Sequence, residues 1–122
     1  MKDQSHNRNV PLGDIIGCVC GTLGVTFEEF FSSRRAMQTV AARELVVALA
    51  QEMTQLSFPE IARQMKRANH STAYTAFDRW QDRIQRHKDG DQSALILVNG
   101  DAVDPQKVYE AIAHQLERTV AA

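Results

Sequence analysis

Apolar residues recur at helical spacing in six segments of the chain, and this pattern predicts an all-α protein. The first helix is expected over residues 11–23, and Gly24 is suited to end it. A short second helix should begin at Thr26, because Thr26 and Glu29 have the spacing of a capping box. Its aromatic side chains are expected to enter the core: Phe27, Phe30 and Phe31.

Residues 36–53 form a long helical segment that neither Gly nor Pro interrupts. Apolar residues on this segment can share one core-facing stripe, and we therefore expect it to be the central scaffold helix of the fold. The stripe comprises Met37, Val40, Ala41, Ala48, Leu49 and Met53, with Leu45 at its margin.

A helix-turn-helix pattern follows the scaffold helix. Ser57 and Glu60 have the spacing of a second capping box, and Pro59 lies in the first turn, where proline is tolerated. After this short helix, a few polar residues lead to Asn69, which is a good N-cap for a longer helix. The core-facing residues of the longer helix recur at helical spacing: Ala73, Ala76, Phe77, Trp80 and Ile84.

The composition changes after Lys88. Residues 94–98 are a short apolar run that forms a strand or fills the core, and a turn-like stretch follows them. Residues 105–119 predict a last amphipathic helix with Val108, Ile112 and Leu116 on one face. We therefore divide the chain into three parts: a flexible N-terminal tail over 1–10, a helix-turn-helix domain over 11–88 and an acidic C-terminal extension over 89–122.

The net charge of −1 hides an uneven distribution of charge along the 122 residues. Residues 32–88 hold 10 Lys and Arg against 5 Asp and Glu, a balance of +5, whereas the segments before and after carry −2 and −4. A basic middle with acidic flanks favours an anionic partner for the middle segment. The same charges would also fit an ordinary solvated helix surface, so both interpretations stay open at this point.

Several classes of function are disfavoured by the sequence. No apolar run approaches the roughly 20 residues that a membrane span requires, and the polar N-terminus lacks the apolar stretch of a signal peptide. The two cysteines, Cys18 and Cys20, read as buried free thiols of a cytoplasmic protein. Nothing in the sequence places either thiol near His70 as a nucleophile and base, so we expect no enzyme, no metal site and no cofactor.

The start of the longer helix carries small polar side chains, which suit a helix tip in the major groove of DNA. Such side chains let the backbone approach base edges, and the helix N-terminus adds positive potential. Asn can pair with adenine, and the Thr methyl group can touch thymine. The candidates are Asn69, His70, Ser71 and Thr72, with Thr75 and Arg79 on an exposed face further along. The alternative is an N-cap cluster that binds no ligand.

Four stretches of the chain form one ordered set: "SSRR" (32–35), "VAARELVVALAQEMT" (40–54), "SFPEIARQM" (57–65) and "NHSTA" (69–73). In order and spacing they resemble domain IV of the bacterial chromosomal replication initiator DnaA, the duplex-binding domain of that family. The resemblance runs over residues 12–88, nearly two-thirds of the chain. The family's signature is Arg-Asp-His-Thr-Thr-Val, and residues 68–73 read Ala-Asn-His-Ser-Thr-Ala here.

The resemblance implies a role for each matching residue. His70 and Ser71 would read bases in the major groove, and Thr72 would lie near the DNA backbone. Pro59 would sit where the family contacts thymine methyl groups. The resemblance places three further cations on the DNA: Arg35 in the minor groove, and Arg34 and Arg43 near phosphates.

The sequence departs from the family pattern around the signature. Lys66 and Arg67 replace a Gly-Gly pair, which adds cations at a phosphate-facing turn but puts its geometry in doubt. Ala68 and Asn69 replace Arg and Asp, and Gln51 stands at a position that is basic in the family. A lost bidentate contact costs about 1–3 kcal/mol of discrimination. We therefore expect weakened recognition of the family's DNA sites or a changed preferred sequence.

The sequence thus predicts a sequence-specific double-stranded DNA-binding protein that regulates replication initiation or transcription and is associated with the nucleoid. The family's nucleotide-binding loop does not occur, so we do not expect ATP-driven melting of an origin. The candidate DNA-binding residues are Arg34, Arg35, Arg43, Pro59, Lys66, Arg67, Asn69, His70, Ser71, Thr72, Thr75 and Arg79.

The alternative is an adapter that kept the fold and binds the replication initiator or another protein through its C-terminal extension. The apolar stripe of residues 105–119 could dock a partner, form a dimer, lie across the basic face or cap the domain's own core. We favour the last of these.

Overall fold

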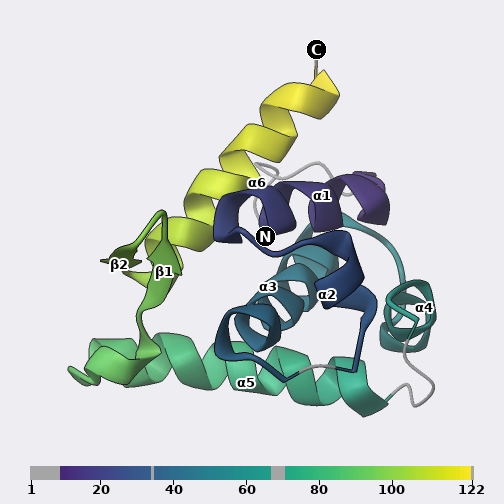
Figure 1. The fold of residues 1–122 in the computed structure, drawn as a ribbon. Coiled ribbons are helices and arrows are strands. Elements are labelled where there is room, and N and C mark those ends of the chain that lie inside the picture. Colours follow the sequence, from purple (N-terminus) through teal and green to yellow (C-terminus); the bar gives the residue numbers. More distant parts are fainter. Residues whose placement is uncertain (1–8, 34, 67–70, 122) are drawn as a thin grey trace, which may run out of the picture.

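The computed structural model describes residues 9–33, 35–66 and 71–121, with the backbone alone for residue 71 and residues 119–121. Within these residues the chain is mainly helical, with one short hairpin, and the all-α fold class is confirmed. Figure 1 shows α3 in the middle of the molecule, with α1 and α5 on opposite sides of it. The elements are α1 (Leu12–Leu23), α2 (Phe27–Phe31), α3 (Met37–Met53), α4 (Phe58–Gln64), α5 (Ser71–Lys88), the 3-10 turn η1 (Gln92–Ala94), β1 (Ile96–Val98), β2 (Asp101–Val103) and α6 (Pro105–Ala121).

Local sequence signals fix the first two helices. α1 ends at Gly24, whose φ of 72° is the left-handed conformation that glycine adopts freely. α2 begins with the predicted capping box: Glu29 N–H donates to Thr26 Oγ1 at 3.0 Å, and Thr26 N–H donates to Glu29 Oε1 at 2.9 Å. Phe30 is fully buried as predicted, but Phe27 is 58% exposed. The prediction for Phe27 is wrong because its ring lies on the surface of α1 beside Gly17.

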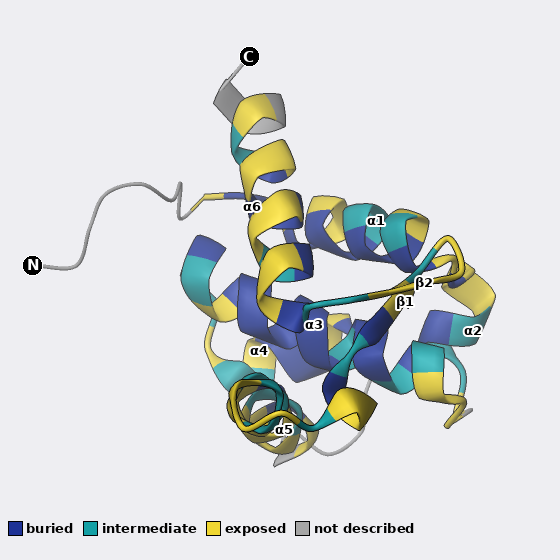
Figure 2. Cartoon of the chain, turned by 90° about the vertical axis from the view of Figure 1, so that its left-hand side faces the viewer, coloured by how far each residue is buried: buried dark blue, intermediate teal, exposed yellow. Residues whose placement is uncertain are grey.

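α3 is the scaffold helix that the sequence predicts. Figure 2 shows this helix as almost wholly buried, because α1, α4, α5 and α6 all pack against it. Burial runs through nearly every position from Ala41 to Ala50, which is broader than the single stripe that we expected. Met37 is 86% exposed, so its assignment to the core is wrong. It is the first residue of α3 and follows the exposed residues 35–36 directly.

α4 and α5 form the predicted helix-turn-helix. The capping box at the start of α4 is confirmed, with Ser57 N–H donating to Glu60 Oε1 at 2.7 Å and Glu60 N–H donating to Ser57 Oγ at 3.2 Å. The ring of Phe58 on α4 lies against two aromatic residues of α5, at centroid distances of 4.4 Å from Tyr74 and 5.6 Å from Phe77. These ring contacts, together with buried apolar residues of both helices, hold α4 against α5.

A β-hairpin follows α5. β1 is the strand that residues 94–98 predict, and it pairs antiparallel with β2 in the register Ile96↔Val103. Asn99 and Gly100 form the turn, with φ values of 54° and 86°. Both lie in the left-handed region that a two-residue type I′ turn requires. The sequence interpretation missed β2, because it treated residues 99–105 as turn-like.

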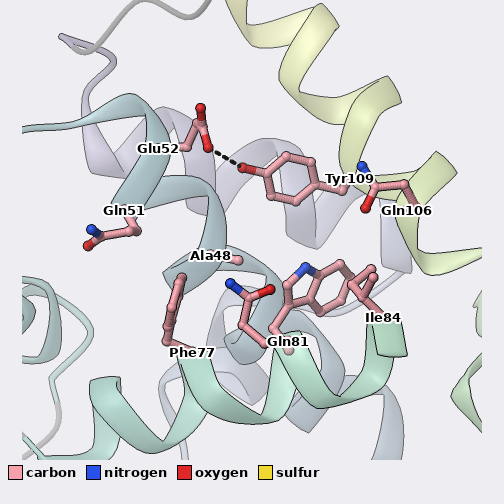
Figure 3. A pocket seen from close by; sticks show the side chains of 9 residues that line it. Ala48, Gln51, Glu52, Phe77, Gln81, Ile84, Gln106 and Tyr109 are labelled. Atoms are coloured by element: carbon pink, nitrogen blue, oxygen red, sulfur yellow. Dashed lines mark hydrogen bonds between the residues drawn. The ribbon is translucent and has the colours of Figure 1, made fainter. Parts of the chain in front are cut away.

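α6 packs onto the helical domain. Its stripe of Val108, Ile112 and Leu116 is buried, so the favoured interpretation that the stripe caps the domain's own core is confirmed. In Figure 3 the Tyr109 hydroxyl points at Glu52 on α3, to whose Oε1 it donates at 3.5 Å. The Tyr109 ring stacks on Trp80 of α5 with centroids 6.3 Å apart.

Residues 11–88 and the C-terminal extension share one hydrophobic core, to which Val108, Ile112 and Leu116 contribute. One bound of the predicted division requires correction. The tail expected over residues 1–10 is too long, because Val10 is buried and its N–H donates to the Met53 carbonyl at 3.1 Å. Residues 1–8 are outside the part that the structure describes. No helix in the described part is both long and apolar enough to cross a membrane.

Candidate nucleic-acid interface

The structure describes some of the predicted DNA-binding residues and not others. Arg34, Arg67, Asn69 and His70 lie outside the described residues, so their predicted roles stay predictions. Ser71 is the first residue of α5, and only its backbone is described. The remaining members of the predicted set can be placed: Arg35, Arg43, Pro59, Lys66, Thr72, Thr75 and Arg79.

A groove between the start of α3 and the N-terminal half of α5 brings five of these residues together. Its volume is about 260 Å³. Because Thr72, Thr75 and Arg79 are three and four residues apart on α5, they share one face of that helix. The residues that line the groove are Arg35, Val40, Arg43, Glu44, Thr72, Thr75, Ala76 and Arg79. Pro59 and Lys66 belong to α4 and the turn after it, and they do not line this groove.

Two arginines of the groove pair with no acidic side chain among the described residues. Arg35 and Arg79 are exposed, and neither makes a hydrogen bond or ion pair within the described part of the chain. Thr72 and Thr75 line the same groove and are also exposed. Among the described residues, the face therefore presents two unpaired guanidinium groups and two small side chains that can donate or accept hydrogen bonds.

Arg43 lies in the same groove but has a structural task that the sequence prediction did not include. Its guanidinium donates to the carbonyls of Phe30 at 3.0 Å, Glu29 at 3.1 Å and Ser32 at 2.7 Å. These three carbonyls lie in the last turn of α2 and at the residue that follows it. Arg43 thus fastens the end of α2, and with it the start of the basic link, to α3.

A buried ion pair below the groove was also missed. Glu44 lines the groove, and its Oε1 accepts hydrogen bonds from Arg83 Nε at 3.3 Å and Nη2 at 3.2 Å. Arg83 also donates from Nη1 to the Ala94 carbonyl at 3.2 Å. The pair cancels a negative charge that would oppose an anionic ligand. The partners are 39 positions apart in the sequence, which leaves no local sequence signal for the pair.

Lys66 occupies the turn before α5 in a conformation that lysine seldom adopts. Its φ is 61°, in the left-handed region, and its N–H donates to the Arg63 carbonyl at 3.0 Å. The side chain is exposed and makes no hydrogen bond or ion pair with a described residue. The turn thus keeps a glycine-like backbone while it presents a cation beside the start of α5.

The arrangement suits an extended anion better than a small one. The two arginines that pair with no described residue lie on different elements, the link before α3 and the middle of α5, and both line the groove together with two threonines. The described residues contain no group of three or more side chains that could hold a metal ion. A second hollow of about 240 Å³ lies on a different face of α5, between α3, α5 and α6, and Glu52 is the one charged residue in its lining (Figure 3).

Comparison with known protein families agrees with this geometry. The family described as the bacterial DnaA protein helix-turn-helix matches residues 12–79, which run from the start of α1 into α5. The chain belongs to this family. The match includes every element that lines the groove, and it stops before the hairpin and α6. Resemblance to DnaA domain IV, expected from the sequence, is therefore confirmed.

The chain is also similar to curated DnaA proteins. Chromosomal replication initiator protein DnaA of Streptococcus pyogenes serotype M5 is 31% identical over 77 residues, which is 63% of this chain and 17% of that protein. The DnaA proteins of serotypes M1 and M18 match to the same extent. The chain thus matches about a sixth of the length of these relatives, over its DnaA-type helix-turn-helix.

Proposed function

We propose that this protein binds double-stranded DNA sequence-specifically and regulates replication initiation or transcription at the nucleoid. The observation that carries the proposal is the groove at α3 and α5, whose lining brings Arg35 and Arg79 together with Thr72 and Thr75. Membership of the DnaA helix-turn-helix family supports DNA as the anion. The relatives are named chromosomal replication initiators, which supports a role at replication origins.

The proposed docking places the exposed face of α5 in the major groove. Thr72 and Thr75 are short enough for the backbone of α5 to approach base edges, and their methyl groups can contact thymine. Arg79, one turn further along, would then reach the phosphate backbone. Arg35 precedes α3 on the other wall of the groove and would enter the adjacent minor groove. Arg43 would act mainly by positioning the link, since its hydrogen bonds to α2 hold it in place.

Selection of bound duplexes from a random library tests this proposal directly. The expected result is an enriched motif that binds more tightly than unrelated duplex by a factor of about 10³ or more. Thr75→Ala should change or weaken the preference at one base position, whereas Arg79→Gln should lower affinity for all sequences alike. Lys107→Gln, an exposed change on α6, is the matched control. If the wild type binds no duplex, or if no motif is enriched, the proposal fails.

A further inference from the structure

A second groove meets the proposed DNA-binding groove at Arg35. It runs between the start of α3, the C-terminal half of α5 and the hairpin, with a volume of about 470 Å³. Arg35 and Val40 line both grooves. Its apolar lining comes from two distant parts of the chain: Met37, Val40, Ala41, Leu95, Ile96 and Leu97.

Two of these apolar residues are unusually exposed. Met37 is 86% exposed and Leu97 is 53% exposed, although both belong to regular elements of the fold. Large apolar side chains that gather at one place on a protein surface mark a contact with another molecule. Beyond residue 79, where the family match ends, the chain supplies one whole wall of this groove, including Leu95 and Leu97.

The polar residues of the groove are engaged in holding its walls together. Gln38 on α3 donates from Nε2 to the carbonyls of Leu23 at 2.9 Å and Leu97 at 2.6 Å. Arg83 donates to Ala94 and Glu44, and Arg86 pairs with Asp82 at 2.8 Å and Asp91 at 3.4 Å. The groove is therefore formed in advance, and its two inner arginines are already neutralised.

Arg35 is the one cation lining this groove that pairs with no described residue. The groove consequently offers an apolar floor with a single available positive charge at the end nearest the DNA-binding face. We propose that it binds an acidic, apolar segment of a partner protein, with apolar side chains on Met37 and Leu97 and a carboxylate on Arg35. The unpaired guanidinium of Arg35 favours an acidic group in the occupant, and the apolar lining favours apolar side chains beside it.

Because Arg35 lines both grooves, a partner segment bound in the second groove would interfere with DNA binding in the first. A carboxylate that pairs with Arg35 withdraws this guanidinium from the neighbouring groove, so the segment and DNA compete for the protein. This competition rests on the proposed DNA binding, whereas the binding of the segment does not. The two proposals can therefore fail separately.

Two dyes of the same shape test the groove on the full chain. Anilinonaphthalene sulfonate has an apolar body and an anionic group, and N-phenylnaphthylamine has nearly the same body without the charge. We expect fluorescence of both dyes to rise and saturate on binding. The double variant Met37→Gln, Leu97→Gln should weaken both by at least about tenfold, whereas the exposed control Phe27→Gln should not. Arg35→Gln should weaken the sulfonate about tenfold and leave the neutral dye unchanged.

A competition experiment identifies the occupant. A synthetic amphipathic peptide of leucine and glutamate should displace the sulfonate dye, and its leucine and lysine counterpart should not. A duplex obtained from the random-library selection should displace the same dye from the wild type but not from the Arg35→Gln variant. Unchanged dye binding in the Met37→Gln, Leu97→Gln variant would contradict the claim that this groove is a binding site. Failure of the acidic peptide to displace the dye would contradict the claim that the occupant is an acidic, apolar segment. If duplex binding is absent in a separate titration while the acidic peptide still binds, only the proposed DNA function fails.

Discussion

The carboxylate of Glu44 on α3 and the guanidinium of Arg83 on α5 meet at 3.2 Å beneath the proposed DNA-binding groove. Their side chains are only 7% and 13% exposed. Arg83 also donates to the Ala94 carbonyl in η1, so this one side chain of α5 contacts both the scaffold helix α3 and the segment that follows α5. The position of α5 relative to α3 therefore depends on this pair.

Removing Arg83 should destabilise the protein strongly. Arg83→Met leaves the buried carboxylate of Glu44 without its partner, and the free energy of unfolding should fall by about 3 kcal/mol. The double variant Glu44→Met, Arg83→Met should recover most of the loss, because no buried charge then remains. Urea unfolding measures both values. Arg86→Met, which removes the solvent-exposed pairs with Asp82 and Asp91, should cost less than about 1 kcal/mol. Equal losses for Arg83→Met and Arg86→Met would contradict the role given to the buried pair.

Lys66→Gly, in the turn before α5, should raise the stability of the protein and lower its affinity for DNA. Glycine adopts the observed φ of 61° without the clash that a Cβ atom causes, so unfolding should require about 1 kcal/mol more than in the wild type. Affinity for every duplex should fall, because the substitution removes a cation. Thermal unfolding and a duplex titration measure the two effects.

Lys66→Ala is the matched control for this change. It removes the same cation but keeps a Cβ atom, so it should weaken DNA binding as Lys66→Gly does without the gain in stability. A gain in stability from Lys66→Ala would show that the backbone at residue 66 is not strained.

Protonation of Glu60, the capping carboxylate of α4, should account for part of the loss of stability in acid. Hydrogen bonds from the Ser57 backbone and side chain hold the pKa of Glu60 below its usual value. A depressed folded-state pKa contributes stability above the unfolded-state pKa, and this contribution is lost as the pH falls through the folded-state pKa. Glu60→Gln should therefore flatten the decline of the unfolding midpoint below about pH 4.5. An unchanged decline in this variant would show that the carboxylate does not contribute.

The cysteine thiols should react slowly in the folded protein. Burial, with a smaller effect of Glu29, raises the pKa of Cys20 to about 11, and burial also raises the pKa of Cys18. Because the thiolate is the reactive form, alkylation by iodoacetamide near pH 8 should be roughly a hundredfold slower for Cys20 than for an ordinary thiol. Urea should restore the ordinary rate. Fast modification of Cys20 in the folded chain would contradict its burial.

Features set by local chemistry could be predicted from the sequence. The capping boxes at Thr26 and Ser57 and the left-handed Gly24 depend on residues a few positions apart, and all three are confirmed. The Asn99-Gly100 pair is an equally local hairpin signal, and it would have revealed β2 had it been read as a type I′ turn.

Features set by packing between distant elements could not be predicted. Periodicity placed Met37 in the core, but the hairpin that borders it is more than fifty residues away in sequence. The hydrogen bonds of Arg43 to α2 and the pairing of Glu44 with Arg83 depend in the same way on how helices meet. Two of the groove-lining cations, Arg35 and Arg43, came from the family resemblance, whereas helical spacing after Thr72 identified Thr75 and Arg79.

The salt dependence of duplex affinity tests the central claim most directly. If Arg35 and Arg79 contact DNA phosphates or the minor groove, log affinity should fall linearly with log salt concentration, and Arg79→Gln should reduce the slope by about one. Arg35→Gln should lower affinity with a similar loss of slope, whereas Arg118→Gln on α6 should leave both unchanged. A slope that all three variants share with the wild type would contradict the claim that the groove between α3 and α5 is where this protein binds DNA.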